Sequence, residues 1–253
     1  GNSWYNDFMK YIESTQNKQI KERAKLLQKK ERDRSKLFLV EGHHMIEEAI
    51  AANCLKEIYL LEGEDNFTDL EPIFCSQQVI NKLSSQNSNA KIIGVCTKPD
   101  IQPEKFDVVL LLDGIQDPGN VGTILRSAYA FGVDYVYLSK DCADIYNPKT
   151  LQSSQGAIFH IGTMNTDLYD TIRFLQIENT TIYATSLHEP YKNLQEVKPK
   201  LPYGLVLGNE GKGIRQDILD ICDMSIKIEM DTFESLNVAT ACSICLYTLK
   251  HAS

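Results

Sequence analysis

The first hundred residues alternate between short apolar runs and stretches with helical spacing. Between residues 16 and 30, Ile20, Ala24 and Leu27 recur at spacings of four and three, which predicts an amphipathic helix. Strands are expected at 36–40, 57–61 and 91–96, with a weaker candidate at 72–75. A helix is expected at 43–52, with inward-facing Met45, Ile46, Ala49 and Ile50. This alternation predicts a small α/β domain.

The second half of the chain shows the same alternation with longer elements. Strands are expected at 107–112, 135–138, 159–162, 181–185, 205–207 and 225–228, and helices at about 121–131 and 238–249. Strands that alternate with helices indicate a mostly parallel sheet. The polar segment 97–105 carries two prolines between the halves. We therefore expect a first domain at 1–98, a linker at 99–105 and a second domain at 106–253.

Composition agrees with this two-domain organisation. The chain has 253 residues, of which 43% are hydrophobic and 24% are charged, as in folded globular proteins. The longest apolar run, residues 108–112, is far below the roughly 20 residues that span a bilayer. We expect a cytoplasmic protein with no membrane partner.

Cysteine and histidine positions give little support to metal or redox chemistry. The seven cysteines are scattered, which favours reduced thiols. Cys242 and Cys245 form a C-x-x-C inside a predicted helix, and we interpret them as packing residues, with a zinc or redox site as the minor alternative. The five histidines lack metal-ligand spacing, so no metal is expected.

Charge is distributed unevenly along the chain. The net charge is −8, yet residues 10–36 contain ten basic and four acidic side chains, so this segment carries +6 and the remainder −14. A basic segment on an acidic protein suits docking of a polyanion at one face. A solvated helix face explains the same charges equally well.

The first segment that could bind a ligand or carry out chemistry is the turn at 113–126, which follows a predicted buried strand. Ligands of open α/β sheets bind at the carboxyl ends of strands. Its three glycines allow close approach of the backbone to a ligand, and Arg126 lies about one helical turn beyond Gly122, near a helix start that favours anions. Arg126 is thus a candidate for holding a phosphate, although an ordinary surface arginine fits too.

The second segment, residues 205–214, is another strand that enters a glycine-rich turn. Glu210 would repel phosphates, and Lys212 precedes a glycine and not a hydroxyl residue, so a nucleoside triphosphate site is disfavoured. A cationic ligand such as S-adenosylmethionine fits better. A tight turn ahead of a helix is the structural alternative.

The third segment, residues 228–247, leads into the last helix. Ser235 or Asn237 can cap this helix at its N-terminus, and residues 238–249 are expected to be buried nearly all round.

Together, the order, separation and residue identities of these segments closely resemble the three motifs of the SpoU family, also called the TrmH family, of the SPOUT methyltransferases. The matching residues are Asn120, Gly122 and Arg126 in the first motif, Gly208, Glu210 and Gly213 in the second, and Ser235, Leu236, Asn237 and Val238 in the third. The resemblance covers about residue 106 to the C-terminus. Residues 36–49 more loosely resemble the family's N-terminal substrate-binding domain, which is built like certain small ribosomal proteins.

The resemblance implies an α/β knot: a parallel sheet with the C-terminal segment threaded into a deep trefoil knot. It also implies a homodimer with the active site near the interface, and S-adenosylmethionine as the methyl donor to a ribose 2′-hydroxyl of folded RNA. The implied cofactor-binding residues are Thr185, Leu207, Gly208, Asn209, Gly213, Ile228 and Leu236. The implied catalytic residues are Arg126, Asn120, Glu210, Ser235 and Asn237. The predicted RNA contacts are Lys25, Lys29, Arg32, Arg34 and Lys36.

Arg126 is the residue to which we assign the central role. A guanidinium is effectively never deprotonated in proteins, so stabilising the developing alkoxide or clamping a phosphate suits it better than acting as a base. One departure from the family concerns Glu229, which stands where the family commonly has proline after the isoleucine of the third motif.

Several alternatives to ribosomal RNA methylation stay open at this level. They are a tRNA ribose methyltransferase and a non-catalytic RNA-binding dimer that keeps the fold. A dinucleotide-dependent oxidoreductase is disfavoured because its glycine spacing and its acidic ribose-binding residue are missing. The full N-terminal domain favours ribosomal RNA.

Overall fold

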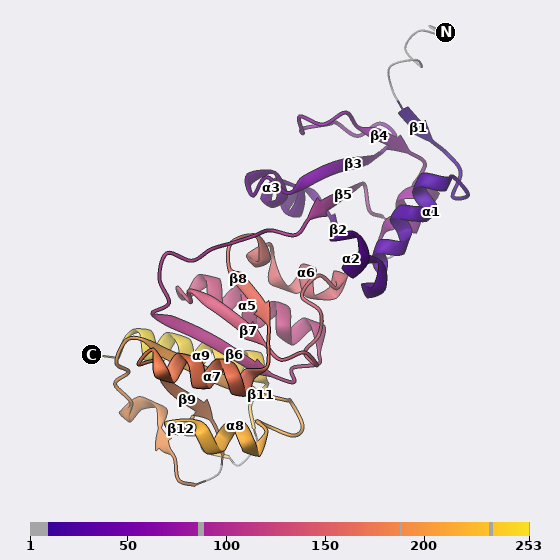
Figure 1. The fold of residues 1–253 in the computed structure, drawn as a ribbon. Coiled ribbons are helices and arrows are strands. Elements are labelled where there is room, and N and C mark those ends of the chain that lie inside the picture. The colour runs from indigo at the N-terminus through magenta and orange to yellow at the C-terminus, as the bar shows by residue number, and fades with distance from the viewer. Residues whose placement is uncertain (1–9, 86–88, 188, 233–234, 253) are drawn as a thin grey trace, which may run out of the picture. The chain divides into compact units, whose positions relative to one another are not determined.

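The structure is a computed structural model that describes residues 10–85, 89–187, 189–232 and 235–252. The chain forms two compact units, each with its own sheet (Figure 1). The first contains residues 1–99 together with 146–151, and the second contains 100–145 together with 152–253. Residues 146–151 therefore lie between two parts of the second unit in the sequence but belong to the first unit in the structure.

The first unit is a mixed five-stranded sheet with short helices. Its strand order is β1-β4-β3-β5-β2, with β1 and β3 parallel to β4, and β5 antiparallel to β3 and β2. The strands are β1 (Lys10–Ile12), β2 (Leu37–Glu41), β3 (Leu55–Leu61), β4 (Ile73–Cys75) and β5 (Ile92–Thr97). The helices are α1 (Lys18–Ala24), η1 (Lys25–Leu27), α2 (Lys29–Ser35), α3 (His43–Ala51) and α4 (Gln77–Leu83).

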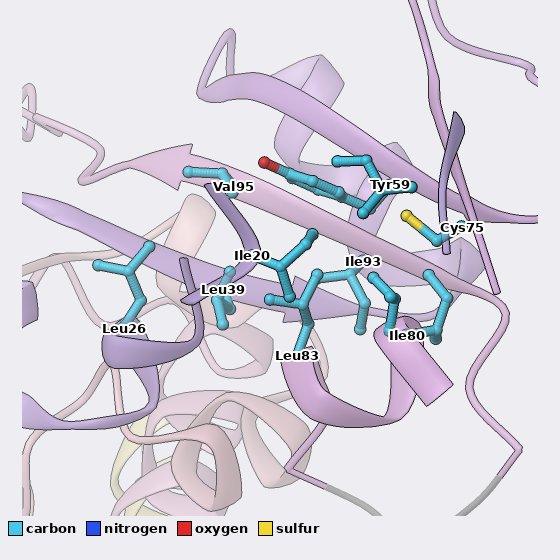
Figure 2. Close-up of a cluster of buried hydrophobic side chains, with 11 residues drawn as sticks. Ile20, Leu26, Leu39, Tyr59, Cys75, Ile80, Leu83, Ile93 and Val95 are labelled. Carbon is cyan, nitrogen blue, oxygen red and sulfur yellow. The ribbon is translucent and has the colours of Figure 1, made fainter. Parts of the chain in front are cut away.

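The core of the first unit forms where α1, η1 and α4 cover the sheet. Ile20, Leu26, Ile80 and Leu83 from these helical segments pack against strand residues, among them Tyr59 and Ile93 (Figure 2). All of these side chains are almost fully removed from water, which is the main source of stability for such a small layer.

Two sequence-based expectations for the first unit are wrong in detail. The helix expected at 16–30 is interrupted, because η1 ends at Leu27 and the backbone of Gln28 is extended. Gln28 is the N-cap of the next helix, α2. This break makes Leu26, and not Leu27, the deeply buried residue. Ile50 was expected to face inward, but it is 40% exposed, whereas Met45, Ile46 and Ala49 of α3 are buried as expected.

The second unit is a seven-stranded sheet in which every pairing is parallel, so the expected parallel sheet is confirmed. Its strand order is β10-β12-β9-β11-β6-β7-β8. The strands are β6 (Val108–Asp113), β7 (Tyr135–Leu138), β8 (Gly162–Asn165), β9 (Thr181–Thr185), β10 (Lys192–Asn193), β11 (Tyr203–Gly208) and β12 (Met224–Lys227). The helical segments are α5 (Pro118–Ala130), α6 (Pro148–Ser154), η2 (Ala157–Phe159), α7 (Leu168–Ile177), η3 (Leu194–Glu196), α8 (Gln216–Ile221) and α9 (Val238–Lys250).

Helices cover both faces of this sheet. One face packs its alternate strand residues, such as Val109, Ala184 and Val206, against α7 and α8. On the opposite face, α5 and α9 contact each other, and α9 also contacts β11 (Figure 1). The Ser127 and Ser243 hydroxyls of these two helices are 2.7 Å apart. The C-terminal helix is thereby fixed beside the helix that follows the first motif.

The segments at 157–165 and 238–250 differ from their sequence-based expectations. Residues 157–159 form a 3-10 turn after Gly156, and the strand begins only at Gly162, because a short buried apolar run does not by itself distinguish strand from turn. The last helix is buried on one face only, since Thr240 and Tyr247 are exposed.

Cys242 and Cys245 lie on the buried face of α9, which confirms their interpretation as packing residues. Burial raises the pKa of the Cys245 thiol to about 12 and also raises the pKa of Cys242. Across the described ranges, no group of three potential ligands is placed to hold a metal ion. In the same ranges, no helix is long and apolar enough to cross a membrane.

Candidate active site

A cavity of about 1100 Å³ lies at the carboxyl ends of β9, β11 and β12, in the second unit. This size suits a nucleoside-sized ligand. The pairing of β11 with β9 ends at Val206, whereas its pairing with β6 continues to Gly208. The backbone of Leu207 and Gly208 therefore extends past the last residue paired with β9 and lines the cavity.

The first turn enters α5 beside this cavity. Asp117 is the N-cap of α5, because its Oδ1 accepts a hydrogen bond from the Asn120 backbone N–H at 2.9 Å, and Pro118 occupies the first helical position. This cap orients the first helical turn so that the Asn120 side chain lies at the cavity wall.

The second turn folds back tightly on the end of β11. The backbones of Asn209 and Gly213 bond to each other in both directions, and the Asn209 side chain accepts from the N–H groups of Gly211 and Lys212, each at 2.9 Å. A Cβ on Gly208 would lie 2.3 Å from the backbone nitrogen of Ile214, so only glycine fits there. Glu210 directly follows Asn209 inside this closed turn and lines the cavity.

Asp113, the last residue of β6, connects the first turn to the end of the second turn. Its carboxylate is buried and accepts a hydrogen bond from the Arg215 backbone N–H at 2.8 Å, while the Arg215 Nε lies 3.6 Å from the other oxygen. Burial raises the pKa of Asp113, against the opposing effect of Arg215. The Asn209 side-chain amide also donates to the Gly114 carbonyl at 2.7 Å. Both ends of the second turn are thus fixed to the first.

A chain of side-chain hydrogen bonds joins all three segments. Asn237 caps α9 by accepting from the Ala239 and Thr240 N–H groups at 2.9 and 3.2 Å. Its side-chain amide donates to Oδ1 of Asn120 at 3.0 Å, and the Asn120 side-chain amide donates to Glu210 Oε1 at 3.3 Å. Because the helix end requires the Asn237 oxygen, the orientation of each following amide is determined. Glu210 is the acceptor at the end of this chain.

Comparisons with known proteins identify the family. Residues 107–247, more than half of the chain, match the model described as the SpoU rRNA Methylase family. The chain belongs to this family. Residues 17–94 match a second model, the MRM3-like substrate binding domain.

Two relatives of this SpoU rRNA methylase match it over different shares of its length. It is 37% identical over 250 residues to the 23S rRNA (guanosine(2553)-2′-O)-methyltransferase RlmP of Bacillus subtilis, covering 96% of this chain and all of that one. It is 39% identical to the 23S rRNA (guanosine-2′-O-)-methyltransferase RlmB of Coxiella burnetii, over 56% of this chain and 58% of that one.

Solved structures agree with the fold. A crystal structure of an RNA 2′-O ribose methyltransferase superposes with a TM-score of 0.82 at 29% identity, covering 94% of this chain and 97% of the other. An rRNA methyltransferase from Sinorhizobium meliloti, at 23% identity and a TM-score of 0.85, shows the same fold over 96% of this chain and 98% of the other.

Eleven of the twelve residues predicted for the SpoU site meet around the cavity. They are Asn120, Glu210, Ser235 and Asn237, together with Thr185, Leu207, Gly208, Asn209, Gly213, Ile228 and Leu236. Arg126 is the exception. Its side chain is exposed on α5 and does not line the cavity, because Arg126 lies six positions after Asn120 and so projects from a different face of the helix. The catalytic role of Arg126 stays a prediction.

The sequence did not point to several other residues of the cavity wall. Asp117, Ser186, Lys212 and Lys227 also line it. Asp117 had a usable signal, since an aspartate followed by proline is typical of a helix start. Ser186 directly follows β9, and Lys227 is the last residue of β12. Only the strand order shows that the ends of these two strands lie together.

Glu229, the departure from the family pattern, contacts the segment after β9. Its carboxylate accepts a hydrogen bond from the Gln195 side chain. Nearby, the Lys227 ammonium lies 4.8 Å from the Tyr191 ring centre, and β10 pairs with β12. These contacts hold residues 191–195 against the strand that leads into the third motif.

The basic residues predicted to contact RNA lie in the MRM3-like domain and differ in exposure. Lys25, Lys29, Arg34 and Lys36 are exposed, and the first three form ion pairs with Glu22, Asp33 and Glu31, each three or four positions away in the chain. Arg32 is different, because its side chain is only 2% exposed and donates to the Leu26 carbonyl at 3.1 Å. The prediction that Arg32 contacts RNA is therefore wrong for this structure: its guanidinium stabilises the turn at η1.

Proposed function

We propose that this SpoU methylase transfers a methyl group from S-adenosylmethionine to a ribose 2′-hydroxyl of ribosomal RNA. The observation that supports this most directly is the hydrogen-bonded chain from Asn237 through Asn120 to Glu210 at the rim of one cavity. The names of the relatives RlmP and RlmB, both 23S rRNA 2′-O-methyltransferases, support ribosomal RNA over tRNA.

The cavity wall suits the cofactor in both shape and chemistry. Leu207, Ile226 and Leu236 offer apolar surface for an adenine ring, and the strand ends offer backbone donors and acceptors that can read its edge. Thr185, Gly208 and Ile228 would hold the adenosine by their backbones, with Asn209 and Gly213 shaping the turn. When bound, S-adenosylmethionine supplies an electrophilic methyl on a sulfonium, whose positive charge Glu210 would attract.

The remaining predicted residues would position the RNA. Ser235, exposed at the cavity mouth, would bind the acceptor ribose. Arg126 would clamp a phosphate next to that ribose, because a guanidinium is a permanent, bidentate anion ligand. The exposed Lys25, Lys29, Arg34 and Lys36 would bind RNA phosphates farther along.

The assembly that we propose is a cytoplasmic homodimer with the active site near its interface. The family resemblance supports this assembly, and the trefoil knot that the resemblance also implies stays a prediction. The domain limits 1–98 and 106–253, joined by a linker, likewise remain our proposal.

A transfer assay tests the proposed function. Methyl-labelled S-adenosylmethionine is supplied with ribosomal RNA or with tRNA, and digestion of the product locates the label. We expect label on a ribose 2′ oxygen of ribosomal RNA, and a strong loss of transfer for Arg126→Ala.

Three results would contradict this proposal. Tight RNA binding without transfer by the wild type would favour a non-catalytic RNA-binding dimer. Label on a base would exclude 2′-O chemistry, and label confined to tRNA would exclude ribosomal RNA as the substrate.

A further inference from the structure

Resting on the proposed function, we infer that Glu229 is a positioning residue for the cofactor. Through a hydrogen bond from Gln195, it holds the chain that leaves β12 so that the side chains of Ile228 and Met230 face the cavity. Glu229 is also the residue at which the sequence departs from the family pattern. The contacts that support this role join segments of one chain, so they do not depend on a second copy.

Glu229 lies between two residues of the cavity wall without lining the cavity itself. Ile228 and Met230 line it and are half-buried, whereas Glu229 is exposed. Successive side chains of an extended chain point to opposite sides, and these three residues follow that pattern. The Glu229 side chain therefore points away from the cavity while its two neighbours point into it.

The chain from Ile228 to Met230 has little support from the sheet. β12 ends at Lys227, and its pairing with β9 ends one residue earlier, at Ile226. In the described ranges, the N–H groups of Glu229 and Met230 donate to no backbone carbonyl. The orientation of this part of the cavity wall therefore depends on side-chain contacts.

Gln195 supplies such a contact from a well-supported segment. Its side-chain amide donates to the Glu229 carboxylate. Gln195 lies in η3, which directly follows β10, buries Leu194 and contacts α9. β10 in turn pairs with β12. The hydrogen bond therefore fastens the exit of β12 to a segment that is itself fixed to the sheet and to the last helix.

This hydrogen bond can replace the constraint that proline supplies at the same position in the family. Proline fixes φ at about −65° and lacks an N–H donor, whereas glutamate leaves φ free. Proline would cost no backbone hydrogen bond at position 229, because in the part of the chain that the structure describes the Glu229 N–H donates to no carbonyl. A wall that is already oriented binds its ligand more tightly, since less ordering is needed on binding. The Gln195 bond therefore raises the affinity for the cofactor.

Calorimetric titration of the full chain with S-adenosylhomocysteine, the product form of the cofactor, tests this role. We expect Glu229→Ala and Gln195→Ala each to raise the dissociation constant roughly 3- to 10-fold, the effect of losing one hydrogen bond. Glu229→Gln keeps an acceptor oxygen and should stay close to wild type. Glu196→Ala is the matched control, because Glu196 is the exposed residue next to Gln195 and does not line the cavity. The single-turnover rate at saturating cofactor and the urea midpoint should change little in all four variants.

Combined variants separate this constraint from a general effect on stability. Glu229→Ala combined with Gln195→Ala should bind no more weakly than either variant alone, because both changes remove the same hydrogen bond. Glu229→Pro restores a fixed φ and should bind with an affinity close to wild type. In the Glu229→Pro background, Gln195→Ala should have no further effect, since the amide has no carboxylate left to hold.

Three outcomes overturn the assignment. They are wild-type affinity in both alanine variants, additive losses in the double variant, and a urea midpoint that falls in parallel with affinity. Failure of the wild type to bind S-adenosylhomocysteine is a different result, because it removes the proposed function itself. Hydrogen exchange of the Glu229 and Met230 amides in the ligand-free protein then decides. Faster exchange in Gln195→Ala supports the constraint, and unchanged exchange overturns it.

Discussion

The Asn237 side-chain amide donates to Oδ1 of Asn120 across 3.0 Å, although the two residues are 117 positions apart in the chain. Each asparagine also has a second partner, the start of α9 for Asn237 and Glu210 for Asn120. The cap of the last helix is thereby coupled to the Glu210 carboxylate in the second turn. Asn237 stabilises the fold and orients the site at the same time.

Substitutions of Asn237 should separate these two roles. Asn237→Ala removes the cap, and we expect the free energy of unfolding to fall by about 1 kcal/mol. Asn237→Ser keeps a capping oxygen, so its stability should stay near wild type. Both variants remove the amide that holds Asn120. If this hydrogen bond contributes about 1.4 kcal/mol, its loss lowers the methyl-transfer activity of both variants about tenfold. Urea unfolding and methyl transfer measure the two effects, and full activity of Asn237→Ser would contradict the coupling.

Gly208 should tolerate no side chain. In Gly208→Ala the new Cβ would meet the Ile214 nitrogen at 2.3 Å and the Gly213 carbonyl carbon at 2.4 Å, so the backbone of the turn must move. We expect a loss of about 1–3 kcal/mol in unfolding free energy and a weaker affinity for S-adenosylmethionine. Gly211→Ala is the matched control in the same turn, since its Cβ would be no closer than 3.7 Å to Asn209. Equal behaviour of the two variants in calorimetry would refute the steric explanation.

The exposed lysines and Arg32 should respond differently to substitution. Replacing Lys25, Lys29 and Lys36 together by glutamine should make RNA affinity less dependent on salt. In a plot of the logarithm of the binding constant against the logarithm of the salt concentration, the slope should become shallower by roughly 0.7 to 0.9 for each RNA phosphate that the variant no longer neutralises. Stability should change little, because exposed ion pairs contribute little.

Arg32→Met is the counterpart to the lysine variant. It leaves the Leu26 carbonyl without the guanidinium at 3.1 Å, so we expect a loss of about 1–3 kcal/mol in stability with an unchanged salt slope. Binding titrations across salt concentrations, combined with urea unfolding, test both variants. A reduced salt slope for Arg32→Met would show that Arg32 does reach RNA.

Asp113 should make stability depend on pH. Burial raises its pKa in the folded state above the value of about 3.9 for an unfolded chain. The folded state therefore holds this proton more tightly, and the contribution of Asp113 to stability falls as the pH rises from about 4 through the raised pKa, then stays constant. Asp113→Asn lacks this slope. Urea unfolding of both proteins from pH 4 to 7 should show wild type losing stability relative to the variant, and a gain would contradict the sign.

The comparison with sequence-based expectations separates local from non-local features. The strands at 135–138 and 181–185 were predicted at the limits that the structure shows, because their apolar runs end at clear breaks. The expected strand at 159–162 was wrong, because Gly156 starts a 3-10 turn whose side chains are as buried as those of a strand. Arg32 was misjudged for a similar reason, since charge along the chain does not show which side chain folds inward.

The sequence by itself determined the parallel α/β class, the family and the residue types of the site, because strand and turn signals are local and the three motifs are specific. The tertiary structure alone decided which residues meet. Parallel strands bring Asn120, Glu210 and Asn237 together only through the order β12-β9-β11-β6, in which neighbours in the sheet are distant in the chain. The direction of each amide hydrogen bond, and the meeting of two donors at Oε1 of Glu210, follow from that proximity and from no local pattern.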